Sequence, residues 1–449
     1  MTHKLRRAVS VVSVLSILGV MLAACGPQGG APAGGATATP GGGAAGAGGL
    51  PEGCANVQMT YWNPFTGPDG PFMQEMVNNF NSANPNIQVT MNTVPGGEYI
   101  TQLSTAAASD TLPDVAVMWA DQVATMAYRN IFRPIPDDIL GSLQLSGGDF
   151  PPDVWKAGEV AGKRYSVPLD IHPMTMFYNE DMLKAAGINE PPDTREEFEQ
   201  AAQAMTKGDQ KGFMLTTGFP VAQIFAMLLY QFGGRWFNED GTKAEWNSDA
   251  GVQALTWMRE AQTKYGEPNL EVDAELAAFK AGKVGMIWNG IWQTTNVTGQ
   301  AVSFTGKATK VPQIGTKYAV WGGSHQLAMP VKKSPDRCKD AAWGIFVKYI
   351  LDNSINWAKA GQIPANNRVR NSAEFKAIEP QASIAPSVEA VFFPPSVPGI
   401  TDAFAPLDEA IGAVMTGKTT DIKGELDRAA EKANQILAEN KQKYGTAPK

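Results

Sequence analysis

Residues 284–292 have the sequence Val-Gly-Met-Ile-Trp-Asn-Gly-Ile-Trp. An apolar run with β-branched residues predicts a buried strand, which here opens into a glycine turn. A tryptophan at a strand end offers a flat apolar face and one N–H donor, and glycine lets the backbone come close to a ligand. These features suit a sugar, which has C–H faces to stack and hydroxyls to hydrogen-bond. We therefore expect Trp288, Asn289 and Trp292 to contact a ligand, with burial in the core as the alternative for both tryptophans.

The N-terminal part of the folded region has an alternating strand and helix pattern. Strands are expected at 57–62, 87–91 and 113–119, and helices at 72–80, 99–108 and 121–129. This order predicts an α/β fold with a mostly parallel sheet that is covered on both faces. Ligands bind such sheets beyond the carboxyl ends of the strands. We therefore expect ligand contacts from Trp62, Asn63, Trp119 and Gln122, although each tryptophan could instead pack in the core.

Residues 163–179 predict the first passage of the chain from one domain to another. A short strand meets Pro168, polar residues follow, and a second strand then begins. Asp170 and His172 would lie on this passage and face a cleft, with a purely structural histidine as the alternative. In the second domain, Trp236 follows a glycine pair at a helix end, and it could reach the cleft or simply close the edge of the domain.

Residues 321–330 predict a return passage that ends at Pro330. They contain Trp321, a glycine pair ending at Gly323, Ser324 and His325. Paired glycines allow backbone N–H groups to point at a ligand, and the two polar side chains add further hydrogen-bond partners.

Two later segments are less distinctive. The polar loop 361–368 places Arg368 at a possible site rim, with a plain turn as the alternative, and residues 391–395 predict a third link between domains.

The first 24 residues have the pattern of a secretory signal. Lys4, Arg6 and Arg7 precede an uncharged apolar run from 8 to 22. Leu-Ala-Ala-Cys at 22–25 resembles the lipobox of bacterial lipoproteins, which implies cleavage before Cys25 and lipidation of its thiol. Residues 25–53 would then be the lipidated cysteine and a linker rich in Gly, Ala and Pro, with a flexible span of about 30 Å.

Charge and cysteine usage narrow the class of protein. The chain has 37 Lys+Arg and 44 Asp+Glu, and loss of the three basic signal residues leaves 34 and 44, a net charge near −10. An acidic chain without a basic run is not expected to bind nucleic acid. The remaining length of about 400 residues is more than a single hydrophobic core usually organises, so two domains are expected.

Cys54 and Cys338 remain after Cys25, and in an exported protein they are candidates for a disulfide, with two free thiols as the alternative.

The sequence lacks the common catalytic motifs. It has no Gly-x-Ser-x-Gly elbow, no His-Glu-x-x-His and no Cys/His spacing typical of a metal site. We therefore expect no enzyme, no cofactor and no bound metal.

Several motifs, in order and spacing, resemble one family. They are Met-Thr-Tyr-Trp at 59–62, Pro-Asp-Val at 113–115 with Trp119, Lys-Arg-Tyr at 163–165 with Pro168, Phe-Tyr-Asn at 177–179, Ala-Phe-Lys-Ala-Gly-Lys at 278–283 with Gly-x-Trp at 290–292, Gly-Gly at 322–323 and Gly-x-x-Pro at 361–364. The chain from 55 to 449 is similar to the extracellular solute-binding proteins of bacterial ABC importers, and specifically to the carbohydrate-binding group that includes maltose-binding protein.

The resemblance implies a type II periplasmic-binding-protein fold, with two α/β lobes joined by three crossings and a ligand cleft between them. We expect the first lobe at 54–168 and 331–390, and the second at 169–330 and 391–449. The implied function is capture of a sugar or oligosaccharide by a monomeric lipoprotein, anchored on the outer face of the cytoplasmic membrane or in the periplasm, and its delivery to the transmembrane subunits of an ABC permease. The alternatives are a glycerol-phosphate or phosphodiester ligand, which predicts a cationic cleft, and a sensor or adhesion lipoprotein without a permease.

Overall fold

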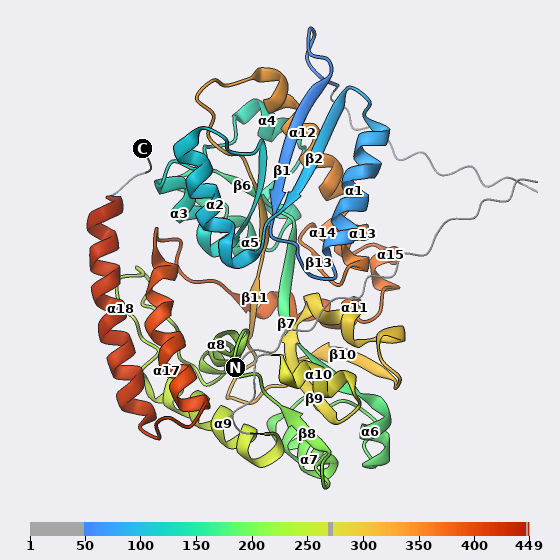
Figure 1. The fold of residues 1–449 in the computed structure, drawn as a ribbon, viewed down its shortest axis with the longest axis vertical. Coiled ribbons are helices and arrows are strands. Elements are labelled where there is room, and N and C mark those ends of the chain that lie inside the picture. Colours follow the sequence, from blue (N-terminus) through green and yellow to red (C-terminus); the bar gives the residue numbers. More distant parts are fainter. Residues whose placement is uncertain (1–48, 268–272, 446–447, 449) are drawn as a thin grey trace, which may run out of the picture. The chain divides into compact units, whose positions relative to one another are not determined.

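A computed structural model describes residues 49–267, 273–445 and 448 of the chain (Figure 1). The expected signal segment, Cys25 and the linker up to residue 48 lie outside the described residues. Within residues 49–267 and 273–445, no helix is both long enough and apolar enough to cross a lipid bilayer.

The first sheet has five strands in the order β2-β1-β3-β12-β6. They are β1 (Val57–Asn63), β2 (Ile87–Thr93), β3 (Val115–Trp119), β12 (His325–Ala328) and β6 (Ser166–Pro168). The first three strands are parallel, as the alternating pattern predicts, whereas β12 runs antiparallel to both β3 and β6. The carboxyl ends of β1 and β3 therefore lie at the same edge of this sheet.

Helices cover both faces of the first sheet (Figure 1). Val115 and Val117 of β3 share one core with α1 (Gly70–Ala83) and α12 (Arg337–Asp352). Ala116 and Met118, which point to the opposite face, share a second core with α2 (Gly96–Ser109) and α3 (Val123–Tyr128). This alternation explains why β3 lacks polar residues, since both of its faces are buried. Shorter elements nearby are α4 (Asp137–Ser142), α5 (Pro152–Lys156), β4 (Glu159–Val160) and β5 (Lys163–Arg164).

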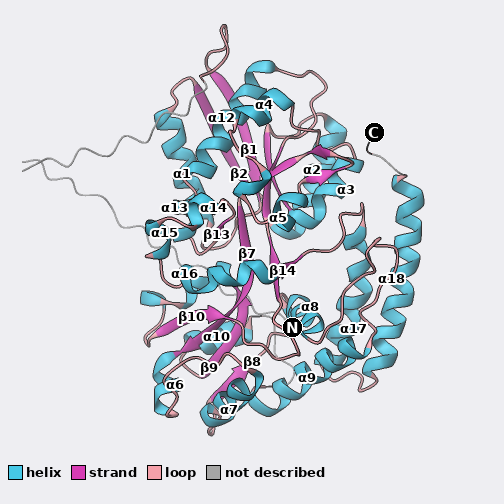
Figure 2. Ribbon diagram, turned by 180° about the vertical axis from the view of Figure 1, so that it is seen from behind, coloured by secondary structure: helices cyan, strands magenta, loops and turns pink. Residues whose placement is uncertain are grey.

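The second sheet is organised around β7 (Asp170–Asn179), the long strand that lies in its middle (Figure 2). All ten residues of β7 are buried. Its main order is β14-β11-β7-β9-β8, and two further strands, β10 and β13, also pair with β7. Their bounds are β8 (Lys211–Met214), β9 (Val284–Gly290), β10 (Gly306–Lys310), β11 (Val320–Gly323), β13 (Ile363–Pro364) and β14 (Val391–Phe392). The segment 284–292 thus contains the buried strand that its composition predicts, and β9 runs antiparallel to β7.

Helices surround the second sheet. They include α6 (Glu180–Ala185), α7 (Arg195–Met205), α8 (Val221–Gln231), α9 (Asp249–Tyr265), α10 (Ala274–Lys280), α11 (Thr294–Val297), α16 (Gln381–Ile384), α17 (Ala405–Met415) and α18 (Ile422–Tyr444). Thr194 and Glu197 form the capping box that begins α7. Near the first sheet, α13 (Ile355–Lys359), α14 (Asn367–Arg370) and α15 (Ala373–Lys376) follow α12.

The chain passes between the two sheets at short, well-defined points. It leaves the first sheet after β6, and Leu169 separates that strand from β7. It returns at Ser324, between β11 and β12. We expected residues 325–330 to remain in the second lobe, and this is wrong for 325–328, because β12 buries Leu327 and Ala328 in the cores of the first sheet. Residues 363–364 already pair with β7, so contact with the second sheet also resumes before the expected link at 391.

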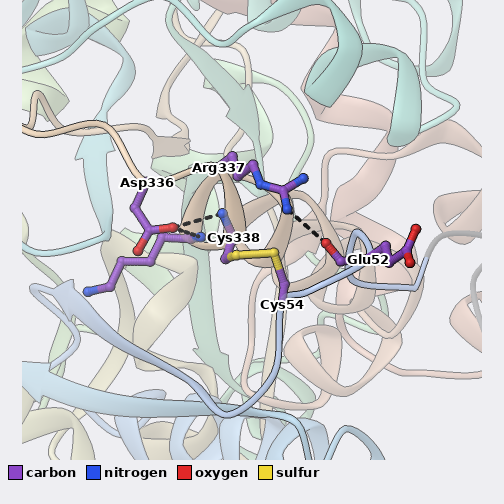
Figure 3. Close-up of a disulfide and its surroundings, with 6 residues drawn as sticks. Glu52, Cys54, Asp336, Arg337 and Cys338 are labelled. Carbon is purple, nitrogen blue, oxygen red and sulfur yellow. Dashed lines mark hydrogen bonds between the residues drawn. A yellow bond between two sulfur atoms is a disulfide. The ribbon is translucent and has the colours of Figure 1, made fainter.

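Cys54 and Cys338 form a disulfide, with their Cα atoms 5.5 Å apart (Figure 3). Cys54 precedes β1, and Cys338 lies in the first turn of α12, where Asp336 caps its backbone N–H. A guanidinium nitrogen of Arg337 donates to the carbonyl of Glu52 at 2.7 Å beside the disulfide. The covalent bond and this hydrogen bond together fix the first residues of the folded region onto α12.

Candidate functional site

The two passages between the sheets meet at the carboxylate of Asp170. Asp170 is the first residue of β7 and is completely buried. It accepts hydrogen bonds from Nδ1 of His172 (3.0 Å), Nδ1 of His325 (2.8 Å), the backbone N–H of His325 (3.0 Å) and Nε1 of Trp357 (2.7 Å). A buried carboxylate needs such donors to offset its lost hydration. We call Asp170, His172, His325 and Trp357 the hinge cluster, because it joins residues next to both passages.

The electrostatics of the hinge cluster favour an ionised acid and a neutral base. Burial by itself would raise the pKa of Asp170, but the nearby His325 and the hydrogen bonds from both histidines hold this pKa well below its ordinary value. Burial, followed by the proximity of His325, lowers the pKa of His172, and the bond to Asp170 offsets this only in part. At neutral pH the cluster therefore holds a carboxylate beside a neutral His172.

Aromatic rings on the second sheet surround the two histidines. The ring centroids of His172 and His325 are 4.3 Å apart, and those of Trp292 and Trp321 lie 5.9 and 6.2 Å from His172. Trp292 and Trp321 are half-buried. Trp292 also stacks on Phe219 at 5.7 Å with an interplanar angle of 25°, and Phe219 is 61% exposed. Trp292 and Phe219 therefore form a partly exposed apolar surface next to the buried histidines.

Two glycines make room for these rings. A Cβ atom at Gly290 would overlap the ring of Trp292, and one at Gly323 would overlap Nε2 of His172. We expected the pair ending at Gly323 to point N–H groups at a ligand. The structure instead gives that glycine a steric role, since only the absence of a side chain lets the imidazole lie against the backbone.

Residues at the ends of β1 and β3 lie at one edge of the first sheet. Trp119 ends β3, is half-buried, and lies opposite His325 in the strand register. Its ring packs edge-on against Tyr99 at 6.0 Å. Trp62, near the end of β1, is half-buried as well. Gln122 follows β3, but its amide donates to the hydroxyl of Thr401 at 2.8 Å, so this hydrogen bond joins two parts of the protein.

The expected roles of Trp288 and Trp236 in ligand contact are wrong. Trp288 is fully buried, with Phe198, Phe213 and Trp257 within 5.5 Å of its ring centroid. It lies within β9, whose residues are all buried, so its side chain meets the covering helices. Trp236 packs against Tyr230, Phe392 and Phe404 and is 5% exposed.

Four other expected residues make structural contacts. Asn63 is buried and accepts the backbone N–H of Phe65. Asn289 accepts the backbone N–H of Gly290, and its amide donates to Glu275. The hydroxyl of Ser324 is buried and accepts a hydrogen bond from Gln326. Arg368 forms an exposed ion pair of 2.6 Å with Asp352 near the end of α12, and its expected role at the site rim stays a prediction.

Three residues near the site were not expected from the sequence. Phe219 carries the exposed half of the aromatic surface, and its only sequence signal is an aromatic residue in the Gly-Phe-Pro loop before α8. Trp357 supplies a donor to Asp170, but it lies in an ordinary amphipathic stretch. Asp121, between Trp119 and Gln122, is half-buried, and burial raises its pKa to about 6.

A hollow of about 1340 Å³ lies away from the hinge cluster. It is bordered by the start of α9 and by α18, and side chains of both charge signs line it. Arg235, one of these, is already paired with Glu245 at 2.6 Å. None of the half-buried tryptophans described above lines this hollow.

Comparison with known proteins agrees with this architecture. The model of a family described as bacterial extracellular solute-binding protein matches residues 66–354. The chain is 24% identical over 307 residues to maltodextrin-binding protein MdxE of Bacillus subtilis, covering 64% of this chain and 69% of that protein. It is also 24% identical over 380 residues to a maltooligosaccharide ABC transporter solute-binding lipoprotein of Streptococcus pneumoniae, covering 80% and 84% of the two chains.

A solved structure shares the fold. The GacH receptor of Streptomyces glaucescens, determined without ligand and with acarbose, superimposes with a TM-score of 0.76 at 22% identity, covering 86% of this chain and 99% of that one. The family match spans more than half of the chain, and the two sheets have the arrangement expected of a type II binding protein. The chain therefore belongs to the bacterial extracellular solute-binding proteins, with the two-lobed fold of the group related to maltose-binding protein.

Proposed function

We propose that this protein captures a sugar or oligosaccharide between its two lobes and delivers it to the membrane subunits of an ABC importer. The observation that carries the proposal is the aromatic surface of Trp292 and Phe219 beside the hinge cluster. His325 of this cluster is the strand neighbour of the half-buried Trp119 on the first sheet. Flat apolar rings next to hydrogen-bonding groups match the two kinds of surface on a sugar. The names of the maltodextrin-binding and maltooligosaccharide-binding relatives support the same ligand class.

The mechanism we propose is capture followed by release to a permease, without catalysis. A ligand that contacts both lobes binds the closed state more tightly, so it shifts the population toward closure. The short passages at Leu169 and Ser324 are the natural positions for this hinge motion. We further propose that the mature protein is a monomer anchored outside the cytoplasm through lipid on Cys25, as the signal sequence and lipobox imply.

An anionic ligand is disfavoured by the cations that were expected to bind it. Arg368 and Arg235 would have to point into the site, but each forms an ion pair with an acidic side chain elsewhere. The buried carboxylate of Asp170 would also repel a phosphate group nearby. These contacts favour an uncharged sugar over a glycerol phosphate.

A thermal-shift screen tests the proposal. The mature chain, with Cys25→Ser to prevent lipidation, is heated with maltose, maltotriose, galacto- and arabino-oligosaccharides, and glycerol phosphates. A sugar at 100 times its Kd stabilises the folded state by about 2.7 kcal/mol, which raises Tm by a few degrees. If only glycerol phosphates raise Tm, the proposed ligand is an anion and not a sugar. If none of the compounds changes Tm, the proposal that the protein captures a ligand of these classes loses its support.

A further inference from the structure

The carboxylate of Asp170 determines which nitrogen of each histidine carries the proton. An ionised carboxylate only accepts hydrogen bonds, so Nδ1 of His172 and Nδ1 of His325, at 3.0 and 2.8 Å, must both be donors. A neutral imidazole has one N–H group and one lone pair. Each neutral ring therefore has its lone pair on Nε2, and Asp170 sets this tautomer for both rings at once.

Protonation of both rings at once is disfavoured. Their centroids are only 4.3 Å apart, so two positive charges would repel one another, and Asp170 is the one carboxylate bonded to either ring in the described part of the chain. Other titratable groups facing the cluster are Asp69 at the start of α1, which interacts with His325, and Tyr61 on β1, which interacts with Asp170. Burial raises the pKa of each of these two groups.

The two Nε2 atoms have unused hydrogen-bonding capacity. Within residues 49–267 and 273–445, no hydrogen bond to Nε2 of either histidine is found, although the side chains are only 4% and 9% exposed. A donor that reaches either atom can therefore bind there without displacing a bond within the protein. Gly323 keeps the position next to Nε2 of His172 free of a side chain. The rings of the half-buried Trp292 and Trp321 have their centroids 5.9 and 6.2 Å from that of His172.

We propose that Nε2 of His172 and Nε2 of His325 accept hydrogen bonds from two hydroxyl groups of one sugar unit. Asp170 is the positioning residue, because it fixes the acceptor state of both rings without contacting the ligand. Rings 4.3 Å apart suit two hydroxyls of the same sugar ring. A phosphate, whose oxygens carry few or no protons at neutral pH, would place lone pair against lone pair. This inference rests on the proposed function and specifies which ligand atoms the hinge cluster recognises.

The test uses His172→Asn and His325→Asn in the C25S mature chain. An asparagine amide reaches about as far as Nδ1, so it keeps a donor for Asp170 but has no atom at the position of Nε2. We expect each variant to bind maltotriose, or the sugar with the largest thermal shift, roughly two- to tenfold more weakly, because each loses one hydrogen bond. The Tm without ligand should stay within a few degrees of the parent value, since the bond to Asp170 is retained.

Two further measurements separate positioning from structural support. Asp170→Asn can accept from only one ring, so it forces the other imidazole to reverse its tautomer and should also weaken sugar binding. The parent affinity should fall as pH decreases from 7 to 4, because burial lowers the pKa of His172 and protonation of its Nε2 in this range removes the acceptor. The His172→Asn/His325→Asn double variant should lack this dependence, and that loss is not expected from a general change in stability.

Each outcome decides one question. If the parent binds sugar but both single His→Asn variants bind it equally well, the inference is wrong and the proposed function stands. A parent that binds no sugar removes the proposed function itself.

The side-chain oxygen or nitrogen atoms of Asp170, His172 and His325 that could bind a metal ion lie within 4.8 Å of one another, so Zn²⁺ is tested as well. A rise in Tm with Zn²⁺ that the His→Asn variants lack would overturn the inference in favour of a metal site. If the variants fail to fold, a pH-independent parent affinity overturns it.

Discussion

Replacement of Trp292 by alanine should weaken sugar binding by about tenfold. The ring is half-buried, stacks on Phe219 at 5.7 Å and lies 5.9 Å from His172. A tryptophan of this kind leaves on the order of 50 Å² for a ligand to cover. At about 25 cal/mol per Å², this area corresponds to about 1.3 kcal/mol, close to a factor of ten in Kd.

Isothermal titration of the C25S mature chain with maltotriose, or with the best sugar of the screen, measures the effect. Trp155→Ala is the matched control, because Trp155 is also half-buried but stacks on Phe150 and contacts neither histidine of the hinge cluster. We expect this control to change Kd by less than twofold. Equal affinities for Trp292→Ala and the parent would refute the assignment of Trp292 to the site.

Gly290→Ala gives the same prediction without removing any ring atom. The new Cβ would overlap Trp292 and displace its ring, so affinity should fall although residue 290 itself makes no ligand contact in this scheme. Since both changes disrupt the same surface, the Gly290→Ala/Trp292→Ala double variant should bind about as well as Trp292→Ala alone. Additive losses would show that the glycine acts separately from the ring.

Three further predictions concern residues outside the ligand surface. Trp288→Ala should lower the free energy of unfolding by about 3–5 kcal/mol, because it empties a fully buried aromatic site, and calorimetry should show this loss while the folded fraction keeps its sugar affinity. Arg368→Ala should change sugar affinity by less than twofold and stability by at most about 1 kcal/mol, since its pair with Asp352 is exposed; a large loss of affinity in titration would return it to the site. Burial opposes ionisation of Asp114, but the backbone N–H of Thr60 and two lysines hold its pKa below the ordinary value; its stabilisation is therefore present above pH about 4 and lost as pH falls. Asp114→Asn should accordingly lower Tm at pH 7, and equal deficits at pH 7 and pH 3 would contradict this.

Regular elements were predictable because their cause is local. The alternation at 57–62 and the four-residue spacing of apolar residues at 72–80 each reflect which face of a strand or helix is buried, and they correspond to β1 and α1. The boundary of the second lobe was less predictable. We expected the chain to return to the first lobe at Pro330, because proline often ends a strand. The pairing of β12 with β3, which places the return earlier, depends on residues about 200 positions before it.

The side chains of the site were also only partly predictable from the sequence. Trp288 and Trp292 are four residues apart in one segment, yet the first lies in the core and the second at the surface. Both faces of β9 are buried, so the sequence carries no polar alternation that would distinguish them. The position of both histidines beside passages was apparent from the sequence. Their shared bond to Asp170 was not, since His325 and Asp170 are 155 residues apart.

The disulfide between Cys54 and Cys338 has a mechanical consequence. Tension applied through the residues before Cys54 would otherwise act on the first residue pair of β1 and peel the strand from β2 one hydrogen bond at a time. The disulfide transfers that load to α12, whose Trp343 and Phe346 are fully buried. A pull on the N-terminal end would therefore have to extract a helix from the core, which requires many contacts to break together. The strand that leads to Trp62 is therefore shielded from a pull on the residues before Cys54.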